Sequence, residues 1–357
     1  MQKTQPWNGI YHLNKKYIMA KNIALPSLFF ILTLIGCHRE DSSFSSMTKK
    51  MPGEWIIDLA IDMEDNVWFL TGEIDTAVGI EPWRCSLPVK FHLSRLENDR
   101  FHIVEISSVT FHRMIFDRLN NLWSISAYHV LMIDNNEPEV IVDISSSDEG
   151  SLGFIDVDAE NTIWAGGLKT GLLKIKDGNV TRYLSDNSDL PTNSMTAIHI
   201  DQNNIIWIAL WDKQGILKID GDEWTHINSE NSSISNQNIW DLTTTSDGDL
   251  WIGMGWDDVS VSLMYFDGIS WKVENPKTHD GINVTGTVRY LLTDHNDKIY
   301  CAIEVGSNFR NEIYSYDGSG WSLINILPEN DGVSDMEIDQ QNRIWVSTHN
   351  SGYFMIQ

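Results

Sequence analysis

The stretch IDVDAENTIWAGG, residues 155–167, decides the fold, because close copies of it recur along the chain. IHIDQNNIIWIAL begins at residue 198, LTTTSDGDLWIGM at 242, LLTDHNDKIYCAI at 291 and MEIDQQNRIWVST at 336. With two earlier copies, seven aromatic anchors recur at intervals of 41 to 55 residues: Trp68, Trp123, Trp164, Trp207, Trp251, Tyr300 and Trp345. A repeat of about 40 to 50 residues with four strands per unit is typical of a β-propeller. Seven copies predict seven blades.

Each copy carries a polar turn between two strands. Six residues before the anchor stands Asp, or Thr in one copy, whose side-chain oxygen can accept from backbone N–H groups and start a turn. Three residues before it stands a type that tolerates positive φ, which predicts a hairpin closed by a type I turn with a left-handed residue. These left-handed positions are Asp65, Asn120, Asn161, Asn204, Gly248, Asp297 and Asn342.

The rest of the body is also β-structure. An aliphatic residue always precedes the aromatic anchor, which predicts a strand buried on both faces between neighbouring blades. Four Asp-Gly pairs between short apolar runs predict outer hairpins, at residues 177–178, 220–221, 267–268 and 317–318. No helical periodicity of useful length follows residue 50. We therefore expect an all-β, seven-bladed propeller of four-stranded blades over residues 55–357.

Composition excludes one class of partner. The chain has 357 residues and 42% hydrophobic content, enough for one large domain with an ordinary core. Its formal net charge is −25, which argues against nucleic acid, because phosphate binding needs clustered Lys and Arg. Much of this acidity comes from the Asp of each repeat turn, so the charge alone says little more about function.

Residues 1–37 have the pattern of a targeting segment. Lys15, Lys16 and Lys21 precede an apolar run over residues 23–35, which is shorter than the roughly 20 residues of a membrane span. The run ends in Leu-Ile-Gly-Cys, which resembles a bacterial lipobox and implies a lipidated Cys37 as the mature N-terminus. His38 after this cysteine resembles lipoproteins sorted to the outer membrane. Translation from Met1 and from Met19 both remain open.

Residues 38–54 are Ser-rich and have the composition of a tether. The seventh repeat stops after its third strand, so its outer edge would be unpaired. We expect residues 44–49 to supply the missing outer strand and close the ring within the last blade.

The repeat D-x-x-(G/N)-x-(I/L)-W-(I/V)-(G/S), followed by strands such as Gly-Leu-Leu-Lys-Ile at 171–175 and later by Leu-Pro-Thr-Asn-Ser at 190–194, resembles the two-component regulator propeller repeat. The resemblance covers nearly all of residues 55–357. It implies a ligand-binding propeller of the kind that forms periplasmic sensors for oligosaccharides. Here it would be a single propeller in a stand-alone lipoprotein, with no kinase or regulator segment in the sequence.

Candidate ligand-binding residues gather in the loops between the second and third strands of the blades. Three tryptophans outside the repeat positions fall there: Trp83, Trp211 and Trp256. Polar, charged and aromatic neighbours accompany them in these loops: Arg84, Asp212, Lys213, Asp257, Asp258, Asn308, Phe309, Arg310 and His349. Aromatic faces stack on sugars while polar groups bind hydroxyls, so a shared face of this composition suits an oligosaccharide. The alternative is that these tryptophans only pack the loops together.

Other chemistries have less support. The Asp residues at 212, 257 and 258 lack a spaced calcium-ligand loop, and no His or Cys motif for zinc is present. We expect no metal, no cofactor and a monomer. The favoured hypothesis is a lipid-anchored cell-envelope protein of the outer membrane that binds an oligosaccharide or a partner carrying one. A lyase or hydrolase resembling streptogramin lyase in its repeat is one alternative, and a protein interaction platform is another.

Overall fold

The computed structural model describes residues 55–73, 90–97, 100–104, 111–134, 136–145, 150–255, 262–306, 310–329 and 331–357. These residues form 27 β-strands in seven antiparallel sheets, which are the seven blades of a β-propeller. No helix occurs among them, so none is available to span a membrane. The predicted fold is confirmed. The leader, Cys37 and the proposed closing strand lie outside the described residues.

The strands follow the repeat in order. Blade 1 contains β1 (Trp55–Ile61), β2 (Val67–Glu73), β3 (Lys90–Glu97) and β4 (Arg100–Val104). Blade 2 contains β5 (Arg113–Phe116), β6 (Leu122–Ile125), β7 (His129–Asp134) and β8 (Glu137–Asp143). Blade 3 contains β9 (Ser151–Val157), β10 (Ile163–Leu168), β11 (Leu172–Lys176) and β12 (Asn179–Tyr183). Blade 4 contains β13 (Met195–Ile200), β14 (Ile206–Leu210), β15 (Gly215–Asp220) and β16 (Glu223–Ile227).

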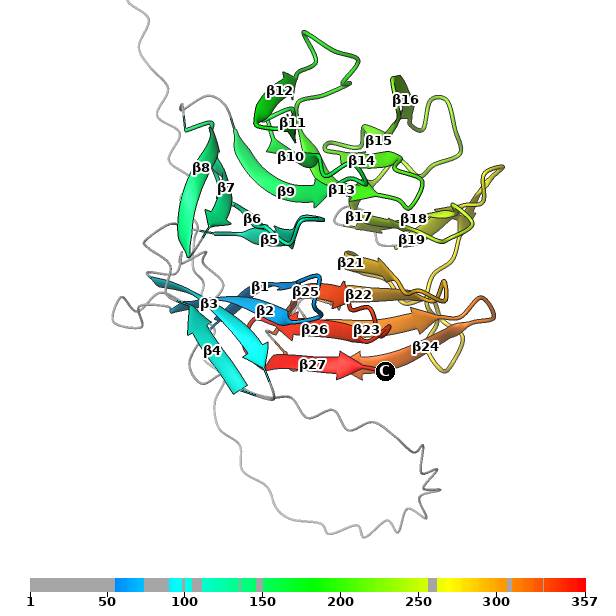
Figure 1. Cartoon of the computed structure of the whole chain (residues 1–357). Helices are drawn as coiled ribbons and strands as arrows, with labels where there is room; N and C mark the ends of the chain where they lie inside the picture. Colours follow the sequence, from blue (N-terminus) through cyan, green and yellow to red (C-terminus); the bar gives the residue numbers. More distant parts are fainter. Residues whose placement is uncertain are drawn as a thin grey trace, which may run out of the picture. The chain divides into compact units, whose positions relative to one another are not determined.

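The remaining blades continue the pattern. Blade 5 contains β17 (Asn238–Thr244), β18 (Leu250–Gly255), β19 (Leu263–Phe266) and β20 (Trp271–Val273). Blade 6 contains β21 (Thr287–Thr293), β22 (Ile299–Val305), β23 (Arg310–Tyr316) and β24 (Trp321–Ile326). Blade 7 contains three described strands, β25 (Val333–Ile338), β26 (Ile344–Thr348) and β27 (Gly352–Ile356). The first strand of each blade contacts that of the next, and Figure 1 shows these inner strands facing one another across the centre.

The second strand of each blade forms the core, as the aliphatic-aromatic pairs predict. Every residue of β6, β14, β18 and β26 is buried. Each anchor packs between its own blade and the next. The second strand, which carries the anchor, is covered on both faces and has no face exposed to solvent. Burial of one such side chain contributes about 1.5–3 kcal/mol.

The repeat turn has the predicted geometry. All seven left-handed positions have positive φ, between 61° and 66° for the Asp and Asn residues and 89° for Gly248. In blade 3, Asp158 Oδ1 accepts from the N–H groups of Glu160 and Thr162, at 2.9 and 2.8 Å. Its Oδ2 accepts from the indole N–H of Trp164 at 3.0 Å. The same aspartate-to-indole bond occurs at Trp68, Trp123, Trp207 and Trp345.

The left-handed residue also connects neighbouring blades. Its Oδ1 accepts from a backbone N–H in the turn of the preceding blade, and we call this ring of bonds the turn belt. The donor and acceptor pairs are Met63 to Asn120 (2.8 Å), Arg118 to Asn161 (2.8 Å), Ala159 to Asn204 (2.7 Å), Ser246 to Asp297 (2.6 Å), His295 to Asn342 (2.8 Å) and Gln340 to Asp65 (3.1 Å). The last pair joins blade 7 to blade 1. One step is missing, because Gly248 of blade 5 has no side chain to accept from Gln202 of blade 4.

We expect Gly248→Asn to complete the turn belt and stabilise the fold. A Cβ at Gly248 meets no atom within 4 Å, and Asn tolerates the left-handed conformation. The added hydrogen bond is worth about 0.5–1.5 kcal/mol. Chemical denaturation would measure the change in unfolding free energy. Gly248→Ala is the control, because it restricts the unfolded chain equally but adds no acceptor and is strained at positive φ. Equal stability of the two variants would contradict the role assigned to the bond.

Candidate functional site

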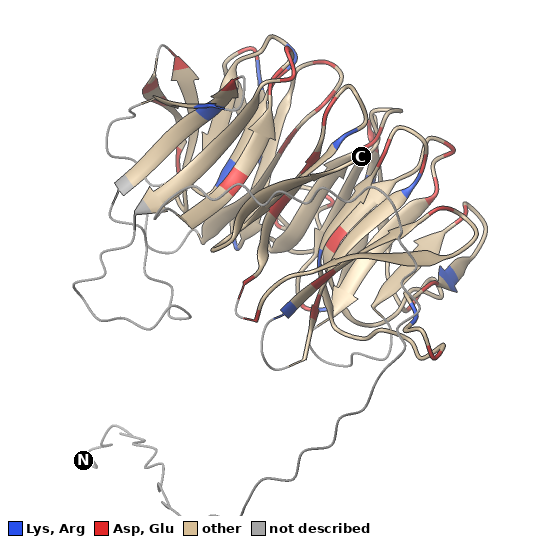
Figure 2. Ribbon diagram, turned by 90° about the horizontal axis from the view of Figure 1, so that it is seen from below, with Lys and Arg blue, Asp and Glu red and all other residues tan. Residues whose placement is uncertain are grey.

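The inner strands surround a central cavity of about 350 Å³. This volume lies in the lower part of the range of small-molecule sites, about 300–1,000 Å³. Carboxylates are prominent in its wall, and Figure 2 shows that Asp and Glu also recur at turns around the blades. The acidic residues that line the cavity are Asp58, Asp156, Asp241, Asp335 and Glu337. An anionic ligand would be repelled from this cavity, whereas hydroxyl or cationic groups would find acceptors.

Arg113 joins three blades inside the cavity. Its Nη1 lies 3.1 Å from Asp58 Oδ1 and 3.0 Å from Asp335 Oδ1. Its guanidinium also lies over the ring of Tyr290, 5.5 Å from the centroid. Burial alone would lower the pKa of Arg113, but Tyr290, Asp58 and Asp335 together raise it, so Arg113 stays protonated. This ion pair was not foreseen from the sequence, because its partners stand far apart along the chain.

Aspartates of the cavity also accept hydrogen bonds from backbone N–H groups. Asp58 Oδ2 accepts from Met114 N–H at 2.6 Å, and Asp241 Oδ2 accepts from Leu291 N–H at 2.7 Å. Asp156 does the same for Ile200 N–H at 3.0 Å. In each case the donor is on the inner strand of the next blade, whose inner edge has no strand beside it. These bonds therefore give the three carboxylates a structural role.

Burial changes the charge state of this cavity. It raises the pKa of both Asp156 and Asp241 to about 7, and the backbone hydrogen bonds to these groups only partly offset it. Burial also raises the pKa of Glu337, where Asp335 adds repulsion. It lowers the pKa of His199 to about 4, so this imidazole is neutral at pH 7 and contacts Thr244 Oγ1 at 2.9 Å. The cavity thus holds carboxyl groups that titrate near neutrality.

The predicted site residue Trp211 contacts one residue of the cavity wall. Its ring meets Trp240, a cavity-lining residue of the next blade, edge to face with centroids 5.7 Å apart. Arg289, also in the cavity wall, lies over Trp240 at 5.2 Å and pairs with Glu304 at 3.0 Å. The structure therefore brings Trp211 together with two residues that sequence reasoning missed. Both stand eleven residues before an anchor, a column that could have identified them.

The loop of Trp211 has an uncommon backbone. Asp212 and Lys213 follow each other at φ 61°, in the left-handed region that residues other than glycine rarely adopt. Two hydrogen bonds hold this turn in place. Trp211 N–H donates to Ser194 O at 3.0 Å and Lys213 N–H donates to Asn238 Oδ1 at 3.1 Å. The turn leaves Trp211 partly exposed and Asp212 exposed.

The other predicted residues divide into two groups. Arg310 begins β23 in blade 6 and pairs with Glu312. His349 is partly buried between blades 7 and 1, where it contacts the ring of Trp55 at 5.2 Å and the carbonyl of Ile56 at 3.3 Å. This contact gives His349 a structural role, while a role in binding stays a prediction. The remaining candidates lie outside the described residues: Trp83, Arg84, Trp256, Asp257, Asp258, Asn308 and Phe309.

Metal binding has no evident centre in the described part of the chain. No three His, Cys, Asp or Glu side chains converge there in an arrangement that could hold an ion. The carboxylates of the cavity instead accept from backbone N–H groups and pair with Arg113. In this structure these carboxylates form hydrogen bonds and ion pairs.

Comparison with known proteins supports the fold. No protein-family model and no curated protein sequence matches the chain. An inactive virginiamycin B lyase from Staphylococcus aureus, solved with quinupristin, has a TM-score of 0.66 at 10% identity and covers 87% of this chain and 97% of that one. A streptogramin B lyase has a TM-score of 0.63 at 14% identity, and the match covers 87% of this chain and 94% of that one. The chain shares their propeller fold.

A third match agrees with the repeat resemblance. The extracellular domain of a two-component system from B. thetaiotaomicron has a TM-score of 0.60 at 14% identity. The match covers 87% of this chain but 39% of that longer one. The likeness to two-component propellers is thus supported at the level of fold. Identities this low carry no statement about substrate or activity.

We expect Asp241→Asn to change the pH dependence of stability. With its pKa raised from 3.8 to about 7, folded Asp241 holds a proton that the unfolded chain releases, so its contribution falls as pH rises between these values. The contribution of His199 to stability instead rises with pH up to about pH 6.5. The informative quantity is therefore the difference in unfolding free energy between variant and wild type. Relative to wild type, the variant should gain stability from pH 5 to 8, by less than about 1.4 kcal/mol per pH unit.

The measurement is urea unfolding across this pH range. Asp212→Asn, which removes an exposed carboxylate outside the cavity, is the matched control and should track the wild type. Parallel curves for Asp241→Asn and wild type would show that Asp241 is ionised in the folded protein.

Proposed function

We propose that the protein is a cell-envelope binding protein that recognises an oligosaccharide, or a partner carrying one, on the face around Trp211. The observation that carries this proposal is the Trp211–Trp240 pair beside the Arg289–Glu304 ion pair. Indole rings supply faces for the C–H surface of a sugar, and the charged groups supply donors and acceptors for its hydroxyls. No step of bond making or breaking is assigned to these residues.

Preorganisation supports the same face. A binding group gains affinity when its conformation is fixed before the ligand arrives. The two left-handed residues after Trp211 are held by hydrogen bonds from blades 4 and 5, so the turn that carries the indole is tied to two inner strands. Strained backbone of this kind is concentrated at ligand sites in folded proteins.

Attachment to the envelope completes the proposal. The lipobox-like Leu-Ile-Gly-Cys places a lipid on Cys37, and residues 38–54 would tether the propeller to the outer membrane. The fold likeness to an extracellular domain is compatible with this location.

We expect an oligosaccharide to raise the thermal midpoint of a soluble form beginning at His38, screened against plant, host and microbial glycans. A ligand at about 100 times its Kd adds roughly 2.7 kcal/mol of stability. Trp211→Ala should abolish the shift, because it removes the exposed ring. Trp271→Ala is the matched control, since Trp271 is a half-buried tryptophan on the outer strand β20.

The alternatives give different outcomes. Binding of a basic protein that weakens with salt and survives Trp211→Ala would favour an interaction platform. Turnover of a glycan or of quinupristin, lost on replacing one His or Glu, would favour the lyase or hydrolase. Absence of any glycan shift would contradict the proposed function.

Lipid attachment has its own test. In a bacterial host that processes lipoproteins, the full chain should incorporate labelled palmitate and sediment with membranes. Cys37→Ser removes the thiol that is acylated, so the variant should lose both properties. Replacing Cys301, a buried cysteine of blade 6, should leave labelling unchanged. Equal labelling of Cys37→Ser and wild type would contradict lipidation at this position.

A further inference from the structure

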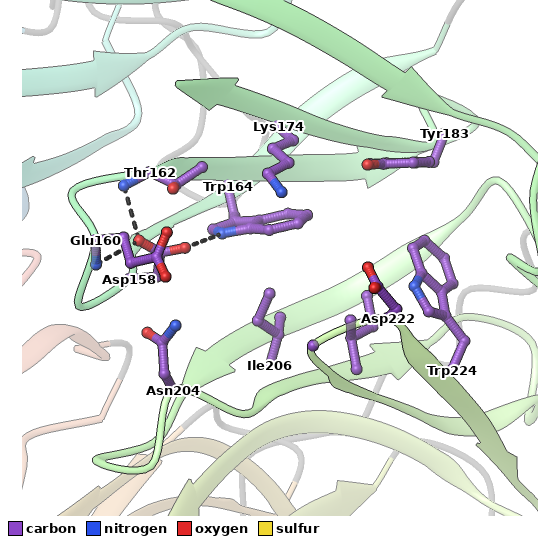
Figure 3. Close-up of a pocket in the computed structure, with 12 residues that line it drawn as sticks. Asp158, Glu160, Thr162, Trp164, Lys174, Tyr183, Asn204, Ile206, Asp222 and Trp224 are labelled. Atoms are coloured by element: carbon purple, nitrogen blue, oxygen red, sulfur yellow. Dashed lines mark hydrogen bonds between the residues drawn. The ribbon is translucent and has the colours of Figure 1, made fainter. Parts of the chain in front are cut away.

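A second cavity, of about 220 Å³, opens between blades 3 and 4. It lies beside the turns that join first to second and third to fourth strands. Antiparallel topology puts these turns at the end of the blades opposite the Trp211 loop. Figure 3 shows its walls: the indole of Trp164 lies between the Lys174 side chain and Ile206, with Tyr183 and Trp224 at the outer side. We call it the blade 3–4 cleft.

The equivalent space between blades 5 and 6 is filled by the protein's own rings. Strand register equates Trp164 with Trp251 and Lys174 with Tyr265. In blade 5, Tyr265 stacks on Trp251 with centroids 4.7 Å apart and planes at 17°. Tyr316 of blade 6 also contacts this indole, at 5.4 Å.

The blade 3–4 cleft has smaller or more flexible residues at both of these positions. Ile219 of blade 4 takes the place of Tyr316, because each pairs with the residue before an anchor. Lys174 takes the place of Tyr265, with its Nζ 5.0 Å from the Trp164 centroid. The cleft therefore leaves open the place that the Tyr316 ring fills between blades 5 and 6. The nearest ring beside the anchor is that of Tyr183, which lies parallel to Trp164 with centroids 6.5 Å apart.

Polar groups around the cleft indicate which kind of ring it could bind. Asp222 is exposed and makes no hydrogen bond or ion pair with the described residues. Asn204 uses its Oδ1 in the turn belt and keeps its NH2 group as a donor. Lys174 adds a cationic donor. Asp158 is already satisfied by the turn and by Trp164, so it belongs to the frame of the cleft.

Donors and acceptors around aromatic faces match a ring that carries hydroxyls. The cavity volume corresponds to about seven waters at about 30 Å³ each, which is room for one sugar ring and too little for an oligosaccharide. We propose that the blade 3–4 cleft binds a single pyranose ring, a terminal residue or a free monosaccharide, with the partly exposed Tyr183 and Trp224 against its C–H surface and Asp222 and Lys174 on its hydroxyls. This site is separate from the face around Trp211 and does not rest on its function.

The test is saturation-transfer NMR of the soluble form with methyl glucoside, methyl galactoside and methyl N-acetylglucosaminide. At least one should bind, and Trp224→Ala should weaken its binding about tenfold by removing one aromatic wall. Asp222→Asn should also weaken it without changing shape. Trp271→Ala, the equivalent residue of blade 5, should have no effect, because strand register places it outside the cleft.

A filling variant keeps the proposal falsifiable if Trp224→Ala is poorly folded. Ile219→Tyr places the ring of Tyr316 in the cleft and should abolish monosaccharide binding while the thermal midpoint stays near wild type. Trp211→Ala should leave monosaccharide binding intact, which separates the two sites. Three results would overturn the proposal: none of the three glycosides binds, Ile219→Tyr leaves binding unchanged, or tetramethylammonium binds selectively instead.

Discussion

The propeller depends on the hydrogen bonds accepted by the carboxylate that stands six residues before six of the seven anchors. One oxygen of Asp117 accepts from the N–H groups of Leu119 and Asn121, and the other accepts from the indole of Trp123. A single buried group thus fixes the turn, its left-handed residue and the orientation of the core ring. That orientation decides how the anchor meets the next blade. The side-chain oxygen of the left-handed residue then accepts a backbone N–H of the preceding blade in the turn belt, so local turn geometry becomes contact between blades.

The inner edge of the ring has a related constraint. Inner strands of a propeller have no neighbour toward the axis, and their backbone N–H groups need acceptors. Asp58, Asp156, Asp241 and Asp335 supply these acceptors from the preceding blade. Burial raises the pKa values of Asp58 and Asp335, repulsion from Asp335 raises that of Asp58 further, and Arg113 offsets part of both shifts. The carboxylates of the cavity are therefore explained by ring closure, without reference to a ligand.

Repetition explains what could be predicted from the sequence. The fold, the anchors and all seven positive-φ positions follow from columns of Asp, Asn and Trp, because each depends on residues within one turn. The turn belt and the Arg113 ion pair could not be predicted, because they join residues about 45 to 280 positions apart whose proximity depends on blade packing. Trp211 was selected because it breaks the repeat. Its partners Trp240 and Arg289 were missed because they stand on inner strands, where a tryptophan or arginine has the appearance of ordinary wall packing.

A repeat architecture also separates positions that maintain the ring from positions free to differ. Trp164 and Trp251 are equivalent, buried anchors, yet Trp251 is covered by Tyr265 and Tyr316, whereas Trp164 is covered by Lys174 and borders a cleft. Two substitutions between otherwise equivalent blades account for the difference, and neither touches the turn that fixes the anchor. Because neighbouring repeats contribute nearly independently to stability, such a change costs the ring little. Binding sites in this protein are therefore best sought where one blade departs from the others, and both the Trp211 loop and the blade 3–4 cleft meet that criterion.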